Sequence, residues 1–288
     1  NAQLTSCPRI TTLRLNGCRG LRALRLSSSS LASLHICWCT HLASLALECD
    51  ALASLYVYGC AKLTSTAVRS VKLACLELQK CASIDDTMLA AMTLSPRAAH
   101  LDLINLTDCK ALRAPRINCA RLRTLHLYNC LQLKSLTLFC PALDMLNLTH
   151  CAEVSALSLA CPALATLLCA GCKQLPDEQM ATVIRVCPAL RTIDLKGCPL
   201  LSHETLAAAE QLLAAKSAAA QGSESCADSA TDEPDLTDSG SNAEAELSVG
   251  GEGERPLQPT NKKIRAAAPL TEGNSPLGEQ GRCCVSAG

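Results

Sequence analysis

The sequence predicts an α/β solenoid built from short coils of about 21 residues. Three observations predict it: cysteines that recur at a fixed interval, leucine-rich phrases between them, and an aromatic content of 2% against 49% hydrophobic residues. In the clearest block the cysteines form two series with a step of 21 residues, namely Cys119, Cys140 and Cys161, and Cys130, Cys151 and Cys172. A fixed period of this length is typical of repeat proteins, whose coils pack only against their neighbours.

Each coil repeats the phrase Cys-Pro/Ala-x-Leu-x-x-Leu-x-Leu-x-x-Cys, and a second Leu-x-x-Leu-x-Leu phrase follows it. The alternation in Leu-x-Leu has period two, which places both leucines on one face of an extended segment. Each coil is therefore expected to carry two short strands, one in a parallel sheet on a concave face and one on the convex side. This is the pattern of a leucine-rich-repeat horseshoe.

A few helical segments are expected to interrupt this pattern. Residues 84–92 place apolar side chains at helical spacing behind two aspartates, and residues 176–186 do the same behind a proline. The coil that holds the first of these is longer, because Cys109 follows Cys81 by 28 residues. Its strand is expected at residues 100–103. Residues 201–220 predict a C-terminal capping helix that begins at Ser202, since a solenoid needs its last coil covered.

The amino-acid composition divides the chain into two expected regions. Residues 1–216 form the solenoid with its cap helix. Residues 217–288 form an acidic, low-complexity tail with no Lys or Arg between positions 217 and 254, and such a segment buries too little apolar area to offset its ordering entropy. The chain begins at Asn1 and is already in repeat phase at Cys7, so we expect it to belong to a longer parent.

The net charge and the cysteine pattern limit the classes of partner and the cellular compartment that we expect. The net charge is zero and no basic stripe is visible, which argues against nucleic acid and against an anionic membrane surface. The 21 cysteines repeat with the coils, so they are expected to be reduced and buried as small hydrophobic side chains. Reduced cysteines favour a cytoplasmic or nuclear location.

A partner is expected on the outward positions of the concave strands. All three tyrosines of the protein fall at these positions, and tyrosine is common at binding hot spots, although it also fits pleated strands generally. Trp38, just past a strand, is expected either to stack near Tyr58 or to cover an edge. The predicted partner-binding residues are Arg14, His35, Tyr56, Tyr58, Glu77, Asp102, His126, Tyr128, Asn147 and Asp194.

No catalytic residue, metal ligand or cofactor is predicted, and the protein is not expected to be an enzyme. The pairs Cys169/Cys172 and Cys37/Cys39 have the spacing of metal or redox motifs, but no second pair or histidine stands at ligand spacing. Packing in the cysteine series is the simpler account of both. A Cys37–His35 catalytic pair would lack a third, orienting group.

The phrase from Cys161 to Pro188, a Cys-Pro-x-Leu repeat followed by LPDEQMATVIRVCP, is similar to the cysteine-containing repeats of F-box leucine-rich-repeat proteins. The IDDTMLAAM segment matches them too, and the short alternating phrases from Cys7 to Cys172 resemble the F-box leucine-rich-repeat protein 15 type. The resemblance covers residues 7 to about 213. It implies a substrate-recognition role in an SCF-type ubiquitin ligase and ubiquitin-dependent protein catabolism. A Skp-type adaptor and a cullin would then be reached through an F-box, which this sequence does not contain. The alternative is a non-ligase scaffold in the cytoskeleton or a cilium.

Overall fold

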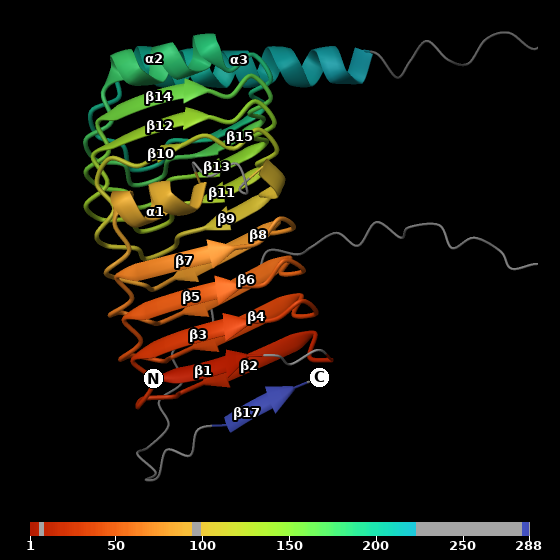
Figure 1. The fold of residues 1–288 in the computed structure, drawn as a ribbon. Helices are drawn as coiled ribbons and strands as arrows, with labels where there is room; N and C mark the ends of the chain where they lie inside the picture. Colours follow the sequence, from red (N-terminus) through yellow and green to blue (C-terminus); the bar gives the residue numbers. More distant parts are fainter. Residues whose placement is uncertain (6–8, 94–98, 223–283, 288) are drawn as a thin grey trace, which may run out of the picture. The chain divides into compact units, whose positions relative to one another are not determined.

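A computed structural model describes residues 1–5, 9–93, 99–222 and 284–287. In this part of the chain, parallel strands stack into a solenoid whose coils follow one another from the N-terminus towards two helices, α2 (Asp177–Val186) and α3 (His203–Gly222) (Figure 1). The predicted coil with two short strands is confirmed. In the coils without a helix, successive strands along the chain alternate between two sheets, and strands one coil apart pair in parallel.

One sheet, the long sheet, takes one strand from every coil, and ten of the described strands belong to it. Its strands, in chain order, are β2 (Thr12–Asn16), β4 (Ser33–Cys37), β6 (Ser54–Tyr58), β8 (Cys75–Gln79), β9 (Leu103–Asn105), β11 (Thr124–His126), β13 (Met145–Asn147), β15 (Thr166–Leu168), β16 (Thr192–Asp194) and β17 (Cys284–Ala287). All its pairs are parallel except β17, which runs antiparallel to β2.

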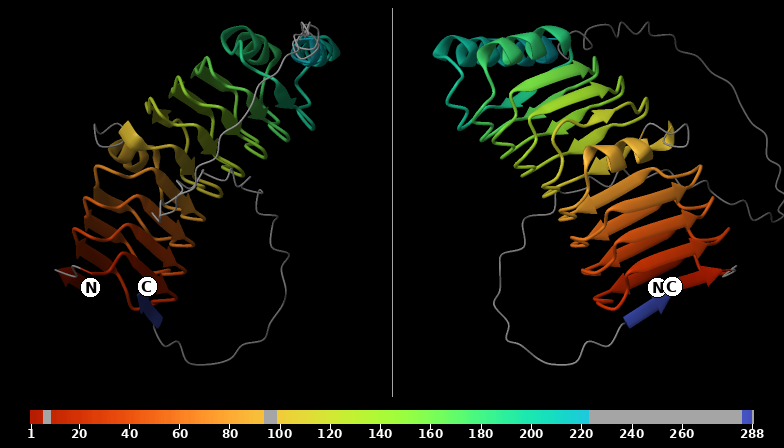
Figure 2. Two further views of the ribbon diagram at one scale, coloured as in Figure 1. Left: turned by 90° about the vertical axis from the view of Figure 1, so that its right-hand side faces the viewer. Right: turned by 60° about the vertical axis from the view of Figure 1, so that its left-hand side comes forward.

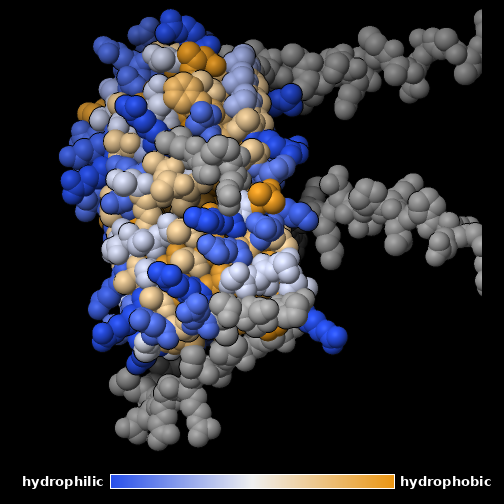
Figure 3. All heavy atoms as spheres, in the orientation of Figure 1, coloured by the Kyte–Doolittle hydropathy of each residue, from blue (hydrophilic) through white to orange (hydrophobic). Residues whose placement is uncertain are grey.

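In the coils without a helix, the other strand enters one of two short sheets. The first holds β1 (Ala2–Thr5), β3 (Ala23–Ser27), β5 (Ser44–Glu48) and β7 (Ser65–Arg69), and the second holds β10 (Arg116–Ile117), β12 (Ser135–Phe139) and β14 (Ala156–Ala160). Helix α1 (Asp86–Thr93) lies between them, where the first short sheet ends (Figure 2). On the face seen in Figure 3, hydrophilic and apolar residues are interspersed.

Register follows the 21-residue period because equivalent leucines face the interior. Leu13 pairs with Leu34, Leu34 with Leu55, and Leu55 with Leu76. Leu34, Leu55 and Leu76 have no exposed surface, and burying one such side chain contributes about 1.5–3 kcal/mol. A slip of one residue would turn each of these leucines outward, so the hydrophobic pattern fixes the register.

The cysteine series is buried as predicted, and it has a hydrogen-bonding role as well. The Cys109 thiol donates to the Leu78 carbonyl at 2.9 Å, and the Cys151 thiol donates to the Leu127 carbonyl at 2.9 Å, so each thiol reaches the coil before its own. Ser70 takes the place of a cysteine in the other series, to which Cys119, Cys140 and Cys161 belong. Its buried hydroxyl donates to the Leu52 carbonyl at 2.7 Å. Sixteen of the described cysteines are free thiols. Cys18 is disulfide-bonded, so the expectation that the cysteines are reduced is wrong at this position.

The longer coil shows one register prediction to be wrong. Its strand β9 starts at Leu103, the last residue of the expected 100–103 segment, and Leu76 pairs with Ile104. Leu101, Ile104, Leu106 and Cys109 are then all fully buried, which completes one Leu-x-x-Ile-x-Leu-x-x-Cys phrase. The expected register would have exposed Ile104 and Leu106. The extra residues of this coil form α1, whose first turn is capped by the Asp85 carboxylate accepting the Met88 N–H at 2.9 Å.

The three expected helices are present. The Ser202 hydroxyl accepts the Thr205 N–H at 3.2 Å at the start of α3, as an N-cap does, and the helix continues to Gly222, beyond the expected boundary at residue 216. Among residues of the predicted tail, 217–222 are helical and 284–287 form β17; the others lie outside the described residues. Within the described ranges, no helix combines the length and the apolar character that crossing a membrane would need.

Candidate functional site

The long sheet carries the predicted partner-binding residues at positions where side chains leave the interior. The third residue of each parallel strand forms what we call the outward column: Arg14, His35, Tyr56, Glu77, Asn105, His126, Asn147, Leu168 and Asp194. Tyr58 lies two positions further along β6, and Tyr128 lies just after β11. Nine of the ten predicted residues therefore lie along this sheet as expected, and their role in binding a partner stays a prediction.

Asp102 is the predicted residue that does not belong to the outward column. Asn105 takes that place, because Glu77 pairs with Asn105. Asp102 lies one residue before β9, where its backbone N–H donates to the Ala74 carbonyl at 2.8 Å. Its carboxylate lies 3.4 Å from the Arg123 guanidinium. The error follows from reading Leu101 and Leu103 as the inward pair of the strand.

Two predicted residues have a structural reason for their identity. The Asn147 side-chain oxygen accepts the Thr149 N–H at 2.9 Å, and an Asp194 carboxylate oxygen accepts the Lys196 N–H at 3.2 Å. Asn105 does the same for Thr107 at 3.1 Å. Such side chains hydrogen-bond the backbone two residues on, which ends the strand in a turn. The strands that end this way, β9, β13 and β16, have three residues each.

Aromatic side chains gather instead on the five-residue strands nearer the N-terminus. The His35 ring stacks on the Tyr56 ring with centroids 4.5 Å apart and planes 13° apart. Trp38 meets Tyr58 edge-on with centroids 5.0 Å apart, and the Lys80 ammonium lies 5.4 Å from the Tyr58 ring centroid. We call His35, Trp38, Tyr56 and Tyr58 the aromatic cluster. Of the two positions expected for Trp38, the one beside Tyr58 is confirmed.

Trp38 has an unusual backbone conformation for a large side chain, with φ at 56°. The equivalent position of each coil, one residue before the cysteine that ends the Leu-x-x-Leu-x-Leu-x-x-Cys phrase, is also left-handed. It holds Gly17, Trp38, Gly59, Lys80, Asp108, Asn129, His150, Gly171 and Gly197. Residues without a Cβ, or with a short polar side chain, are the usual occupants of this region. Trp38 therefore carries backbone strain on the order of 1–3 kcal/mol, and strain of this kind is found most often at functional sites.

The neighbouring coil makes room for the indole. A Cβ at Gly59 would lie 2.6 Å from the Trp38 Cε3 atom, so the ring rests on a backbone that only glycine leaves bare. His150 repeats the arrangement on Gly171 at 2.8 Å, and its ring meets Tyr128 edge-on with centroids 5.4 Å apart. The sequence analysis missed this pattern. Aligning the coils would have revealed it, because a tryptophan stands in a column otherwise filled mostly by Gly, Asn and Asp.

Exposure and charge make the aromatic cluster a suitable contact surface. Trp38 is 50% exposed, whereas Tyr56, Tyr58 and His35 are half-buried and held in place. Burial, with a smaller contribution from Arg14, lowers the pKa of His35, although Glu77 opposes this shift. The imidazole is thus favoured in its neutral form beside Tyr56. A rigid aromatic surface with polar groups at its edge is what protein-binding hot spots present.

Each of the two cysteine motifs contributes one buried thiol, Cys39 or Cys172, to the cysteine series. Cys169 and Cys172 are fully buried, and the Cys172 thiol donates to the Leu148 carbonyl at 3.2 Å. Burial raises the pKa of Cys37, with a further contribution from Cys39, whereas a nucleophilic thiol needs a lowered pKa. A hydrogen bond with Cys60 lowers the pKa of the buried Cys39 to about 7. The His35 ring hydrogen-bonds the Ser33 hydroxyl at 3.0 Å. In the ranges that the structure describes, no group of three or more potential ligand side chains could hold a metal ion.

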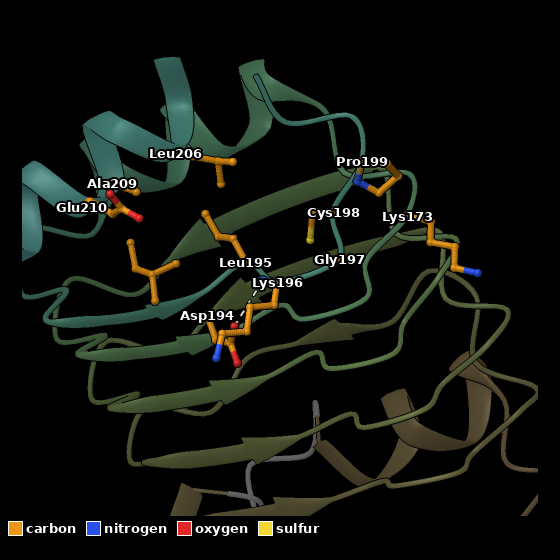
Figure 4. Close-up of a pocket in the computed structure, with 11 residues that line it drawn as sticks. Lys173, Asp194, Leu195, Lys196, Gly197, Cys198, Pro199, Leu206, Ala209 and Glu210 are labelled. Carbon is orange, nitrogen blue, oxygen red and sulfur yellow. Dashed lines mark hydrogen bonds between the residues drawn. The ribbon is translucent and has the colours of Figure 1, made fainter. Parts of the chain in front are cut away.

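A hollow of about 570 Å³ lies at the far end of the stack, between β16 and α3 (Figure 4). Leu195 and Leu206 face each other across it, while Asp194 ends β16 and Lys196 lies in the turn that follows. Asp194 thus borders this hollow, far along the sheet from the aromatic cluster. Comparison with models of known protein families and with curated proteins finds no match for this chain.

Proposed function

We propose that this protein is a protein-binding module of the leucine-rich-repeat type, and that the long sheet is its concave, partner-binding face. A horseshoe curvature and a capping role for α3 belong to the same proposal. The single observation that carries it is the aromatic cluster. Trp38 is half-exposed, packs on the bare backbone of Gly59 beside Tyr58, and has a strained backbone that lowers the stability of the fold. Contact with a partner would explain why a tryptophan is kept at this position.

We further propose that the partner is a substrate of an SCF-type ubiquitin ligase, with the ligase chemistry supplied by other subunits. The resemblance to cysteine-containing F-box leucine-rich repeats supports this role. The free thiols of most described cysteines suit the reducing cytoplasm or nucleus, where such ligases act. An F-box, through which a Skp-type adaptor and a cullin would be reached, would have to come from sequence beyond these residues.

The binding proposal is tested with the double variant Trp38→Ala/Tyr58→Ala. Proteins that bind the unmodified chain are isolated by affinity purification with quantitative mass spectrometry and compared with those bound by the variant. Phe139→Ala is the matched control, because Phe139 is a 52% exposed aromatic residue on a short sheet. We expect a specific partner to be lost from the double variant and kept by the control. Retention by both would contradict the proposed surface.

The ligase proposal is tested on the partner so identified. Depleting this protein from cells should raise the partner's abundance and lengthen its half-life, and a proteasome inhibitor should remove the difference. A partner that depends on Trp38 and Tyr58 for binding, yet keeps its abundance and half-life, would refute the ligase role. It would favour the scaffold alternative while leaving the binding surface intact.

A further inference from the structure

A second hollow, of about 840 Å³, opens at the edge of the long sheet where the strands begin. Its lining comes from the turns that lead into β8, β9, β11 and β13, four consecutive strands of this sheet. Alanines at positions 74, 120 and 142 line it, and their short side chains leave it open. The hollow is distinct from the aromatic cluster, which lies on β4 and β6 and the turn after β4.

Basic side chains from successive coils meet in this hollow. The strand register places Lys72, His100 and Arg121 at equivalent positions of three consecutive coils. Neighbouring parallel strands are roughly 4.8 Å apart, so these side chains form a short row at the spacing of the coils. Arg123 joins them from the turn before β11, and Asp102 is the one acidic residue of the lining. Three permanent cations therefore stand against one carboxylate.

Two of these cations are already oriented. The Arg121 Nη1 atom lies 3.2 Å from the His100 Nδ1 atom. A guanidinium group only donates hydrogen bonds, so Nδ1 is the acceptor of this one. Arg123 is held by Asp102, with Nε 3.4 Å from a carboxylate oxygen. Side chains that are ordered before a ligand arrives lose less entropy when they bind it.

We infer that this hollow binds a phosphate monoester, carried as a phosphorylated side chain by the protein partner. The inference rests on the proposed function, since the partner is the one that lies along the long sheet. A phosphorylated residue carries a charge of about −1.5 to −2 at neutral pH, which matches the surplus of two positive charges in the hollow. Arginine also presents paired donors that match phosphate oxygens. A carboxylate offers half this charge and two oxygens in place of three.

The position of the hollow relative to the aromatic cluster would allow one extended segment of a partner to reach both. Trp38 follows the end of its strand, whereas Lys72 and Arg121 precede the start of theirs. The five residues of a strand span roughly 16 Å at about 3.3 Å per residue, and the hollow lies further along the stack. A partner anchored on Trp38 and Tyr58 would cross the sheet obliquely to place a phosphate in the hollow.

The test uses the full 288-residue chain with inorganic phosphate and O-phosphoserine as probes, followed by NMR shifts of the backbone amides of residues 100–102 and 121–123. Serine and aspartate serve as probes without a phosphate. We expect saturable binding of both phosphate probes, at least tenfold weaker binding of aspartate, and none of serine. Arg121→Gln should weaken phosphate binding at least fivefold. Asp102→Asn should strengthen it about two- to fivefold, because the carboxylate that competes for Arg123 is removed.

Matched controls come from the exposed ion pair between Arg69 and Glu48, whose charged atoms are 3.6 Å apart on the first short sheet. Arg69→Gln and Glu48→Gln change the net charge just as the test variants do, but neither residue lines the hollow. Both should leave phosphate binding unchanged. Equal effects of Arg69→Gln and Arg121→Gln would show a diffuse charge effect and overturn the inference. So would unsaturable phosphate shifts in the unmodified chain, or weaker binding in Asp102→Asn.

Failure of this inference can be told apart from failure of the proposed function. Trp38→Ala/Tyr58→Ala removes the aromatic surface and should leave phosphate binding unchanged. Arg121→Gln keeps the aromatic surface, so it should lose only partners whose capture is abolished by phosphatase treatment. A partner that depends on Trp38 but is insensitive both to phosphatase and to Arg121→Gln would overturn the phosphate inference and preserve the binding surface.

Discussion

Replacing Gly59 by alanine tests the packing of the aromatic cluster, and Gly17 provides an internal reference. Both glycines have left-handed backbones, with φ at 67° and 65°. A Cβ at Gly59 would lie 2.6 Å from Cε3 and 2.9 Å from Cζ3 of Trp38. A Cβ at Gly17 meets no atom within 4 Å. The two substitutions share the backbone penalty and differ in the clash with the indole.

The backbone part is small and common to both variants. A left-handed conformation costs alanine about 1–2 kcal/mol, and alanine recovers about 0.4–1 kcal/mol by reducing the entropy of the unfolded chain. Gly17→Ala should therefore lower the free energy of unfolding by about 1 kcal/mol. Gly59→Ala must in addition displace the indole, and overpacking of this kind costs typically about 1–3 kcal/mol. Because Trp38 is 50% exposed, its ring can swing outward and lose mainly its edge contact with Tyr58. We expect an extra cost of about 1–2 kcal/mol for Gly59→Ala.

Urea unfolding followed by circular dichroism measures both costs, and each glycine variant is repeated in a Trp38→Ala background. In that background the extra cost of Gly59→Ala should vanish, since the cycle isolates the contact between positions 38 and 59. Trp38 is the one tryptophan of the chain, so its fluorescence should also shift in Gly59→Ala and not in Gly17→Ala. Equal costs for the two glycines, or an extra cost that survives without the indole, would refute the described packing.

Three further predictions concern the core, pH and thiol reactivity. Leu125→Asp and Leu146→Asp should abolish cooperative unfolding of the neighbouring coils, because each leucine is fully buried and contributes about 1.5–3 kcal/mol before the added cost of a buried carboxylate; an unchanged thermal melt would contradict this. Burial lowers the pKa of His126, against a smaller opposing effect of Glu77, so the folded chain binds fewer protons than the unfolded chain. Stability should therefore fall as pH drops through about 6.5, the ordinary histidine value, and fall less in His126→Gln, as melting temperatures across a pH series would show. Burial raises the pKa of Cys81 from 9.0 to about 11, which reduces its thiolate roughly 100-fold near pH 8; mass spectrometry after alkylation should find Cys81 modified in urea and protected in buffer.

Much of the fold could be predicted because a 21-residue period reports directly on stacking. Identical phrases must occupy identical places, so Leu34, Leu55 and Leu76 face inward together. The prediction failed where the period broke, at the 28-residue coil. There Leu101 and Leu103 mimic an inward pair locally, and only the burial of Ile104 and Leu106 together with Cys109 selects the true register.

The aromatic cluster could be located from sequence only in part. The outward positions of Tyr56 and Tyr58 follow from the alternation of the strands. The left-handed backbone at Trp38 and the bare surface that Gly59 provides depend on how two coils meet, which no single phrase contains. The pairing of β17 with β2 joins segments more than 260 residues apart, and nothing in the local pattern of either segment predicts it.

In the cysteine series from Cys39 to Cys198, each thiol donates to a carbonyl of the preceding coil, so these junctions share one kind of hydrogen bond. Removing residues 44–64 would bring Ser65 into the place of Ser44, with which it already pairs, and would keep the register of the remaining strands. Removing one residue fewer would turn a whole strand inside out. A gene of this kind can therefore gain or lose whole coils in single steps while the strand register is kept. The length of the solenoid, and with it the area of the long sheet, can then change by one coil at a time.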